Sequence, residues 1–355
     1  MEGFQVTPKP RHQISSRQLD EQLFNAFYYY DLPGLAVAVG SGRQGLEYTK
    51  AFGVKSKATN SPLRPDDIFH MASMAKLFTG TGILQLWEKG QLDLDAPLTG
   101  YLKWFEMKDP AAKGITIRQL LTHTSGMPDV QDYHWDKPQT DAEALKNYAR
   151  SDEIKNMRLL WPPTHKKFSY SNIGYDILGL VLGELTGQTF EDYMSASILK
   201  PLDMADSTFY TPDRNMADIC APHDKNSANE TIPLAHYPYN RIHAPSSTLT
   251  SNLYDTAKWA EAHLNRQVLK PATYDMAWQE FATVPNNGEA ICLSWFSRSQ
   301  NGYRLLGHEG ADVGFRSSFW ICPELDLYTI VCSNLSNAPL KKISKQIFDM
   351  ICGAS

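Results

Sequence analysis

The chain has 355 residues and a formal net charge of −5, with 42% hydrophobic, 21% charged and 11% aromatic residues. This composition is typical of a globular protein and excludes collagen-like, low-complexity and acidic disordered classes. The slight excess of acidic residues argues against nucleic acid as a partner, because nucleic-acid binders usually carry a basic face. At roughly 150 residues per domain, the length predicts two lobes, or one large domain with an insertion.

The cysteines and the first residues of the sequence bear on its compartment. Five cysteines, without CxxC or Cys/His zinc spacing, are expected to be buried reduced thiols. Residues 1–10 lack the apolar core of a secretory signal, and no stretch of 18 apolar residues could span a membrane. We therefore expect a cytoplasmic protein with no membrane span, or a periplasmic or secreted one whose leader has been removed.

Helices and strands are both expected at the two ends of the chain. Residues 17–30 place Leu and Phe at helical spacing, with Ser15 or Ser16 as the N-cap. The strands are predicted from apolar runs bounded by turn residues, and the final helix from its amphipathic period. They are a hairpin over 35–39 and 46–54, strands over 289–297, 303–308, 314–322 and 326–332, and a helix over 340–351.

The middle of the chain is expected to be mainly helical. Helices are predicted over 78–88, 117–121, 173–185, 190–198 and 253–264. The stretch 221–248 is rich in Tyr, Pro and His and is predicted to lack regular structure; loops of that length are usually functional or mobile. Strands at both ends with helices between them predict one sheet assembled from both termini, with a helical region inserted.

The first candidate for chemistry is the segment SMAK, from Ser73 to Lys76. On a helix, positions i and i+3 share a face, so the lysine amine can lie beside the serine hydroxyl. A lysine takes a serine proton only if burial or nearby positive charge lowers its pKa, and the apolar neighbours fit that demand. A second match, Ser197 to Lys200, precedes Pro201, which biases Lys200 away from helix, and we interpret it as a chance occurrence.

The second candidate is the segment YSN, from Tyr170 to Asn172, before a predicted helix. One interpretation is a capping turn, with Ser171 or Asn172 as the N-cap. The other is catalytic, with a phenol that relays protons and an amide that orients substrate and lysine.

The third candidate is His308, Glu309 and Gly310, at the end of a predicted strand and followed by Ala311. A single strand histidine is more often structural. The small residues beside it, however, would let a substrate backbone lie along the strand.

Together, SxxK, YxN 97 residues later and HxG in a C-terminal strand resemble the motif set of the serine β-lactamase and penicillin-binding-protein superfamily. The closest likeness is to class C β-lactamases, D-alanyl-D-alanine carboxypeptidases and their esterase and D-aminopeptidase relatives. It covers about residues 17–350 and includes the linking segments 116–127 (TIRQLLTHTSGM), 168–179 (FSYSNIGYDILG), 201–204 (PLDM) and 307–318 (GHEGADVGFRSS).

The resemblance implies an α+β fold of the β-lactamase/transpeptidase type. An antiparallel sheet built from both termini would be flanked by helices, with an all-helical region inserted. We expect residues 12–70 and 275–355 to form the sheet region and residues 71–274 the mainly helical region, with the active site between them.

The resemblance also implies roles for the motif residues. Ser73 would be the nucleophile that forms an acyl-enzyme, and Lys76 its base or electrostatic support. Tyr170 would pass protons to the leaving group, and either Tyr170 or Lys76 could take the serine proton. Asn172 would hold substrate and lysine in place. The backbone N–H groups of Ser73 and Ala311 would form the oxyanion hole.

The substrate strand would carry His308, Glu309, Gly310 and Ala311. His308 stands where many relatives have lysine, and would contribute hydrogen bonding and positive charge. His123 and Ser125 lie in a stretch typical of the family and are interpreted as structural.

Glu309 departs from the family pattern, which usually has Thr or Ser there to help bind the substrate carboxylate. A glutamate at roughly 4 Å from another carboxylate costs on the order of 4 kcal/mol at an effective dielectric of about 20. Esterase or aminopeptidase-like activity should therefore exceed β-lactamase activity. The alternative is that Glu309 points away from the pocket or pairs with a cation such as Arg316 or Arg241, which would leave specificity unchanged.

Other features have simpler interpretations. His223, His236 and His243 have spacings unlike a metal site and are interpreted as loop histidines, and the sequon at Asn229 as a chance occurrence. No GxSxG, GxxxxGK[ST] or GxGxxG is present, which leaves no basis for an α/β-hydrolase elbow or a nucleotide cofactor. We expect neither cofactor nor metal.

The favoured function is a serine hydrolase that acts through an acyl-enzyme on a small-molecule ester, amide or lactam, as an esterase or D-aminopeptidase-like member of the family. One alternative is a true β-lactamase or D-Ala-D-Ala carboxypeptidase, and another is a non-catalytic sensor or scaffold. Specificity is expected to lie in the loops 127–165 and 221–248. The sequence predicts neither the natural substrate nor an oligomeric state.

Overall fold

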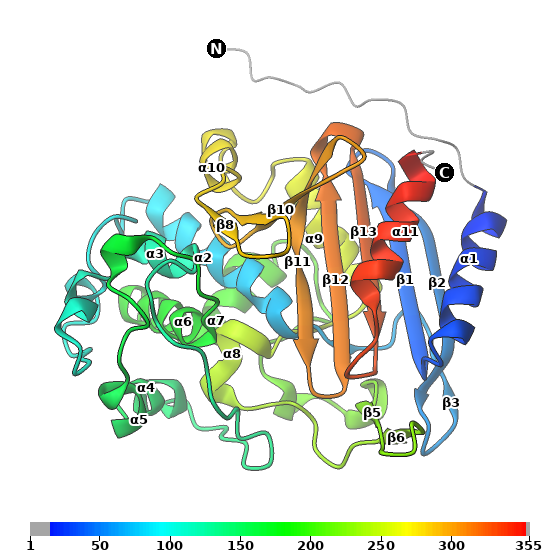
Figure 1. Cartoon of the computed structure of the whole chain (residues 1–355), viewed down its shortest axis with the longest axis horizontal. Helices are drawn as coiled ribbons and strands as arrows, with labels where there is room; N and C mark the ends of the chain where they lie inside the picture. Colours follow the sequence, from blue (N-terminus) through cyan, green and yellow to red (C-terminus); the bar gives the residue numbers. More distant parts are fainter. Residues whose placement is uncertain (1–14, 353–355) are drawn as a thin grey trace.

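The central sheet is assembled from both ends of the described chain, residues 15–352, in this computed structural model (Figure 1). Its nine strands run antiparallel in the order β3-β2-β1-β13-β12-β11-β10-β9-β8. They are β1 (Gly34–Ser41), β2 (Gly45–Ser56), β3 (Ser61–Pro62), β8 (Ala282–Val284), β9 (Glu289–Ile291), β10 (Phe296–Gln300), β11 (Tyr303–Asp312), β12 (Phe315–Cys322) and β13 (Leu327–Ser333). The predicted α+β fold, with a sheet from both termini, is confirmed. The segment 1–10, which lacks a secretory core, lies outside the described residues.

Helices cover both faces of the sheet, and the alternation along β1 shows how. Leu35 and Val37 belong to the core under α1 (Ser16–Tyr29) and α11 (Leu340–Cys352). Ala36 and Ala38 belong to the core that includes α9 (Leu253–Leu264). A strand buried on both faces reads as a continuous apolar run, which explains the sequence LAVAV. Ser15, one of the two predicted N-caps, caps α1 and forms a capping box with Gln18.

The helical region lies beside the sheet, and α2 and α6 form its centre (Figure 1). Both are apolar on nearly all sides, which is typical of helices buried within a core. The helices of this region are α2 (Ala75–Glu88), α3 (Ile117–Leu121), α4 (Ala144–Ala149), α5 (Asp152–Asn156), α6 (Asn172–Thr186), α7 (Phe190–Met194), α8 (Ala244–Ser247) and α10 (Pro271–Ala277).

The strand predicted over 289–297 is wrong, because a turn divides it into β9 and β10. Ser294 adopts a left-handed conformation with φ 71° and inserts between α2 and α6. A Cβ on Gly80 would lie 1.9 Å from Ser294 Oγ, and Tyr175 donates a hydrogen bond to the same oxygen at 2.9 Å. Tertiary packing therefore overrides the local strand pattern here.

The prediction that 221–248 lacks regular structure is also wrong. It contains a small hairpin, β5 (His223–Lys225) and β6 (Thr231–Pro233), followed by the buried helix α8. His223 and His243 are buried and hydrogen-bonded, whereas His236 is exposed, as expected of a loop histidine. Another small sheet, β4 (Phe69–His70) with β7 (Thr250–Ser251), joins the end of this segment to the chain before α2.

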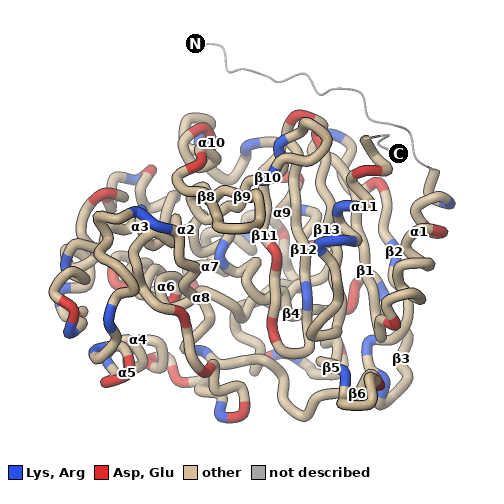
Figure 2. Tube along the Cα trace, viewed as in Figure 1, with Lys and Arg blue, Asp and Glu red and all other residues tan. Residues whose placement is uncertain are grey.

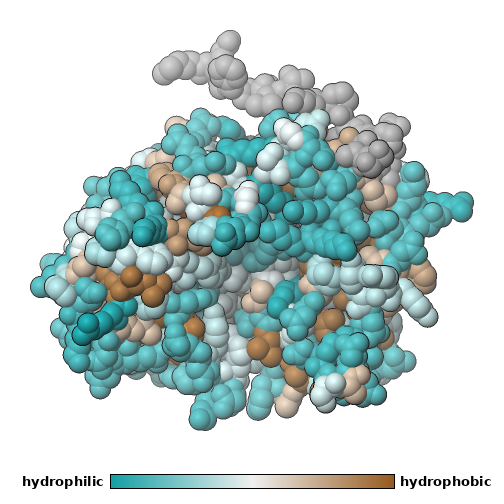
Figure 3. Space-filling model, in the orientation of Figure 1, coloured by the Kyte–Doolittle hydropathy of each residue, from teal (hydrophilic) through white to brown (hydrophobic). Residues whose placement is uncertain are grey.

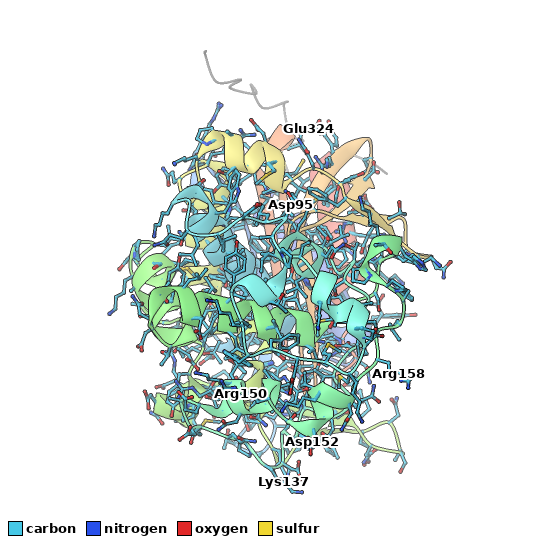
Figure 4. The ribbon with its side chains drawn as sticks, turned by 90° about the vertical axis from the view of Figure 1, so that its left-hand side faces the viewer. Asp95, Lys137, Arg150, Asp152, Arg158 and Glu324 are labelled. Carbon is cyan, nitrogen blue, oxygen red and sulfur yellow. The ribbon has the colours of Figure 1, made fainter. Side chains whose placement is uncertain are left out.

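The surface carries charges of both signs. Lys and Arg are interspersed with Asp and Glu along the chain (Figure 2), and apolar residues form only small patches on the face in Figure 3. The outer face of the helical region exposes Lys137, Arg150, Asp152 and Arg158 (Figure 4). Among residues 15–352, no helix is long and apolar enough to cross a membrane.

Candidate active site

Ser73 lies in a 3₁₀ turn, Ala72–Met74, immediately before α2. Ala72 holds a left-handed conformation with φ 49°, a strained geometry for alanine that is typical of functional turns. Strand β11 packs tightly against the turn at Gly310, where a Cβ would lie 2.3 Å from the Met71 carbonyl oxygen. Gly310 is therefore required for this close approach, which places the end of β11 beside Ser73.

Lys76 is fully buried in the first turn of α2. Its Nζ donates to three oxygens: Ser73 Oγ at 3.1 Å, Asn172 Oδ1 at 2.5 Å and the Ser246 carbonyl at 2.7 Å. Burial lowers the pKa of Lys76 to about 7, although Asp129, Asp176 and Asp312 oppose that shift. The amine is therefore partly neutral near pH 7.

The capping interpretation of YSN is confirmed, and Asn172 also contacts Lys76. Ser171 is the N-cap of α6, and its Oγ accepts from the Gly174 N–H at 3.1 Å. Asn172, the first residue of the helix, directs its side-chain oxygen to Lys76. The cap thus fixes the position of an amide that contacts the lysine.

Tyr170 lies between Lys76 and His123. Lys76 Nζ is 4.9 Å from the centre of the Tyr170 ring, and the His123 ring stacks on it at 4.4 Å. Burial raises the pKa of Tyr170 well above its usual value, and a hydrogen bond with the Ser73 side chain opposes that shift. The phenol is therefore protonated at neutral pH.

His123 and Ser125 form contacts within the chain. The His123 Nδ1 accepts from the Ser171 N–H at 3.1 Å, and Ser125 Oγ accepts from the Met127 N–H at 3.2 Å. Burial lowers the pKa of His123 well below its usual value, so the ring beneath Tyr170 is neutral.

Asp129 is a site residue that sequence reasoning missed. One of its carboxylate oxygens accepts from the Asn172 N–H at 2.8 Å and from Asn172 Nδ2 at 2.9 Å. It therefore fixes the amide so that its oxygen faces Lys76. The only sequence signal was its position two residues after the family-like segment 116–127.

His308 carries no positive charge here, which corrects the expectation that it supplies one. Burial and Lys76 lower its pKa to about 3. Its Nδ1–H donates to the Glu309 carbonyl at 2.7 Å, and among the described residues its Nε2 has no hydrogen-bond partner. A neutral ring with an acceptor nitrogen thus stands where many relatives have a lysine.

Glu309 lines the pocket and is paired, but not with the cations considered above. Its Oε1 accepts from Ser318 Oγ at 3.0 Å and Trp320 Nε1 at 2.7 Å, and lies 3.6 Å from Arg298. Arg241 instead pairs with Glu191, and Arg316 bonds to backbone carbonyls. Burial raises the pKa of Glu309 to about 6.

Arg298 is a second residue that sequence reasoning missed. Its side chain is 3% exposed and its guanidinium lies 3.8 Å from the centre of the Trp320 ring. None of its three nitrogens has a hydrogen-bond partner among the described residues, so its charge is balanced by proximity to Glu309.

A pocket of about 500 Å³ brings the motif residues together. Predicted residues in its lining are Ser73, Tyr170, Asn172, His308, Glu309 and Ala311. Two predicted residues lie outside the lining. Lys76 lies beneath Ser73, and Gly310 is the point at which β11 packs against the turn that carries Ser73. The remaining lining was not predicted and comprises Asp129, Tyr133, Phe168, Val284, Asn287, Glu289, Phe296, Trp320 and Lys341.

Lys200 of the second SxxK match lies away from this arrangement. Its backbone is right-handed helical despite the following proline, which corrects the reason given for excluding it. Its side chain is exposed, in contrast to the fully buried Lys76. Among residues 15–352, no cluster of His, Cys, Asp and Glu could hold a metal ion.

Comparisons with known proteins agree with the fold. The Beta-lactamase family model matches residues 21–348. Protein flp from Staphylococcus aureus (strain N315) is 26% identical over 341 residues, which span 94% of this chain and 66% of that protein.

Solved structures at lower identity share the fold. An octameric penicillin-binding protein homologue from Pyrococcus abyssi has a TM-score of 0.82 at 23% identity, covering 96% of this chain and 78% of that one. A D-stereospecific amidohydrolase from Streptomyces sp. has a TM-score of 0.81 at 20% identity, covering 96% and 100%. On the match of the family model to nearly its whole length, the chain belongs to the β-lactamase family.

Proposed function

We propose that the protein is a serine hydrolase that acts through an acyl-enzyme at Ser73. The observation that carries this proposal is the fully buried Lys76, whose Nζ lies 3.1 Å from Ser73 Oγ and whose pKa is lowered to about 7. A buried amine that is partly neutral at pH 7 can accept the serine proton. A lysine with only a structural role would gain no stability from this burial, because desolvation of the amine costs free energy.

The three contacts of Lys76 define how it acts as a base. A neutral amine has two N–H donors and one lone pair. Asn172 Oδ1 and the Ser246 carbonyl accept the two N–H groups, which leaves the lone pair directed at Ser73 Oγ. Ser73 then attacks the substrate carbonyl carbon while its proton passes to Lys76.

Collapse of the tetrahedral intermediate needs a proton on the leaving group. The Tyr170 phenol is protonated and close to both Ser73 and Lys76, so it donates this proton and recovers one from the Lys76 ammonium. The backbone N–H groups of Ser73 and Ala311, both in the pocket, stabilise the oxyanion. Water then hydrolyses the acyl-enzyme by the same route in reverse.

The charges of the pocket favour substrates without a carboxylate next to the reacting carbonyl. Asp129, Glu289 and Glu309 line it, and Arg298 and Lys341 balance only part of their charge. The neutral His308 supplies no cation to hold a carboxylate. We therefore favour esters and D-amino acid amides, with β-lactams and D-Ala-D-Ala peptides as the alternative substrates.

Labelling with a fluorophosphonate probe tests this proposal against a non-catalytic scaffold. We expect labelling of the wild-type protein at Ser73, no labelling of Ser73→Ala, and normal labelling of the matched variant Ser197→Ala. An unlabelled wild type, or a Ser73→Ala protein that retains more than a few per cent of the hydrolysis rate, would overturn the assignment.

A further inference from the structure

The Ser246 carbonyl, one of the three acceptors around Lys76, comes from a short segment that needs outside support. It lies in α8, which has four residues and follows a 3₁₀ turn, Arg241–His243. A helix of one turn has almost no stability of its own. Contacts with neighbouring helices must therefore hold the carbonyl in place.

Two contacts attach the middle of α8 to the centre of the helical region. Thr79 of α2 donates to the Pro245 carbonyl at 2.7 Å. On α6, Gly179 allows Pro245 to approach so closely that a Cβ there would lie 2.1 Å from the proline ring. Figure 1 shows α8 beside α6.

A third contact holds the beginning of this segment: the pair of His243 with Asp176. His243 Nδ1 donates to Asp176 Oδ2 at 2.8 Å, and both side chains are buried. Asp176 follows Asn172 by four residues on α6, so the two side chains share one face of the helix. One residue on that face contacts Lys76, and the other contacts the segment that carries Ser246.

The His243–Asp176 pair and the contacts of Lys76 form a continuous series of contacts that begins and ends at Lys76. It runs from Lys76 to Asn172, along α6 to Asp176, across to His243, and through the turn to the Ser246 carbonyl. Within the turn, Ser246 Oγ donates to the His243 carbonyl at 3.3 Å. A shift of His243 would therefore move an acceptor that orients the amine.

The surroundings of His243 keep the pair in one geometry. The rings of Tyr133, Trp135 and Tyr148 lie 4.8, 5.8 and 5.4 Å from the imidazole. Burial raises the pKa of Tyr133 and of Tyr148, so both phenols are protonated. Tyr133 also lines the pocket.

We propose that the buried His243–Asp176 pair is a positioning device for acylation, which fixes the Ser246 carbonyl and thereby the orientation of Lys76 toward Ser73. The proposal rests on the proposed hydrolase function and adds two residues to it. Neither residue touches the substrate, and both act through the amine.

The test measures the acylation rate and the KM of an ester substrate in variants of the pair. His243→Phe keeps a ring but removes the donor, and we expect acylation to slow by about 10–100-fold. KM should change by less than about threefold, because the pocket lining is intact. His243→Asn places an N–H where Nδ1 was, and should recover most of the lost rate.

The matched control is His263→Phe on α9. His263 is also fully buried, among Trp259, Tyr274 and Trp295, and makes no contact with the pair. We expect it to alter Tm without slowing acylation. A general loss of packing would slow both variants equally, and that result would contradict the proposal.

The single variant Asp176→Asn covers the case in which His243→Phe does not fold. Asp176→Asn retains an acceptor of the same shape, and we expect it to slow acylation by about 3–10-fold. Where His243→Phe does fold, a double-mutant cycle gives a second check, and the double variant should be no slower than His243→Phe alone. Wild-type rates in Asp176→Asn, or fully additive losses, would overturn the proposal. A wild type that is never acylated would instead overturn the hydrolase function itself.

Discussion

Lys76 Nζ lies 2.5 Å from Asn172 Oδ1, and this contact joins α2 to α6 beneath the pocket. Asp129 accepts from Nδ2 of the same amide, so Asn172 cannot turn its nitrogen toward the amine without losing that hydrogen bond and the one from Lys76. The orientation of Asn172 therefore gives Lys76 an acceptor, and the lone pair of the neutral amine is left for Ser73.

The pH dependence of acylation follows from the base. Lys76 must be neutral to accept a proton, and its pKa is lowered to about 7. The acylation rate should rise about tenfold per pH unit below that pH and level off above it. The pKa of His308 is about 3, so titration of His308 cannot produce this rise of the acylation rate with pH. Stopped-flow acylation between about pH 5 and 9 checks this, and a flat profile would exclude Lys76 as the base.

Removing the Tyr170 hydroxyl should impair catalysis without loss of folding. Tyr170→Phe keeps the ring that packs on His123 and should lower kcat by about 10²–10⁴-fold, the usual size of an acid–base contribution. Tyr274→Phe is the matched control, since Tyr274 is buried, accepts from the Val268 N–H and is not among the residues that line the pocket. If the two variants have equal rates, the Tyr170 hydroxyl has no part in catalysis and Tyr170 contributes only through the packing of its ring.

Lys76→Met separates the contribution of the buried amine to catalysis from its contribution to stability. Turnover should fall by more than about 10³-fold, because the base is lost. The free energy of unfolding should change by no more than about 1–3 kcal/mol, because the avoided desolvation of the amine offsets the loss of its hydrogen bonds to Asn172 and the Ser246 carbonyl. Thermal melts and ester hydrolysis test both, with the exposed Lys200→Met as the control. Retained turnover in Lys76→Met would contradict the mechanism.

Glu309 should set the ranking of substrates. In Glu309→Thr the pocket loses a carboxylate while Arg298 remains next to that position, so kcat/KM for a chromogenic cephalosporin should rise by about tenfold or more while a p-nitrophenyl ester is unaffected. The unbalanced Arg298 should lower stability by about 1–3 kcal/mol. Adding Arg298→Met should restore Tm and abolish the gain. An unchanged ranking of cephalosporin, ester and D-amino acid amide would show that Glu309 does not determine specificity.

The sequence predicted those parts of the site that depend on local spacing. Ser73 and Lys76 are three residues apart, so a helix alone brings them together. Asn172 could be placed because it begins a helix whose N-cap is recognisable. The strand of His308 could be predicted from the turn residues before it, but it runs to Asp312 and not only to His308.

The parts that could not be predicted depend on contacts between distant segments. Asp129 meets Asn172 across 43 residues, and His243 meets Asp176 across 67. Arg298 reaches Glu309 from the neighbouring strand β10, whose beginning the sequence placed wrongly because the turn at Ser294 is fixed by α2 and α6. These contacts depend on how strands and helices that are distant in the sequence pack together. The local sequence pattern does not predict that packing.

The most direct test of the account is the mass of the protein during turnover of an ester. The reaction is quenched in acid within the first turnover, and the intact mass and the digested peptides are measured. We expect a mass increase equal to the acyl group, located on Ser73 and absent from Ser73→Ala. An acyl group on another residue, or turnover by the Ser73→Ala protein, would contradict it.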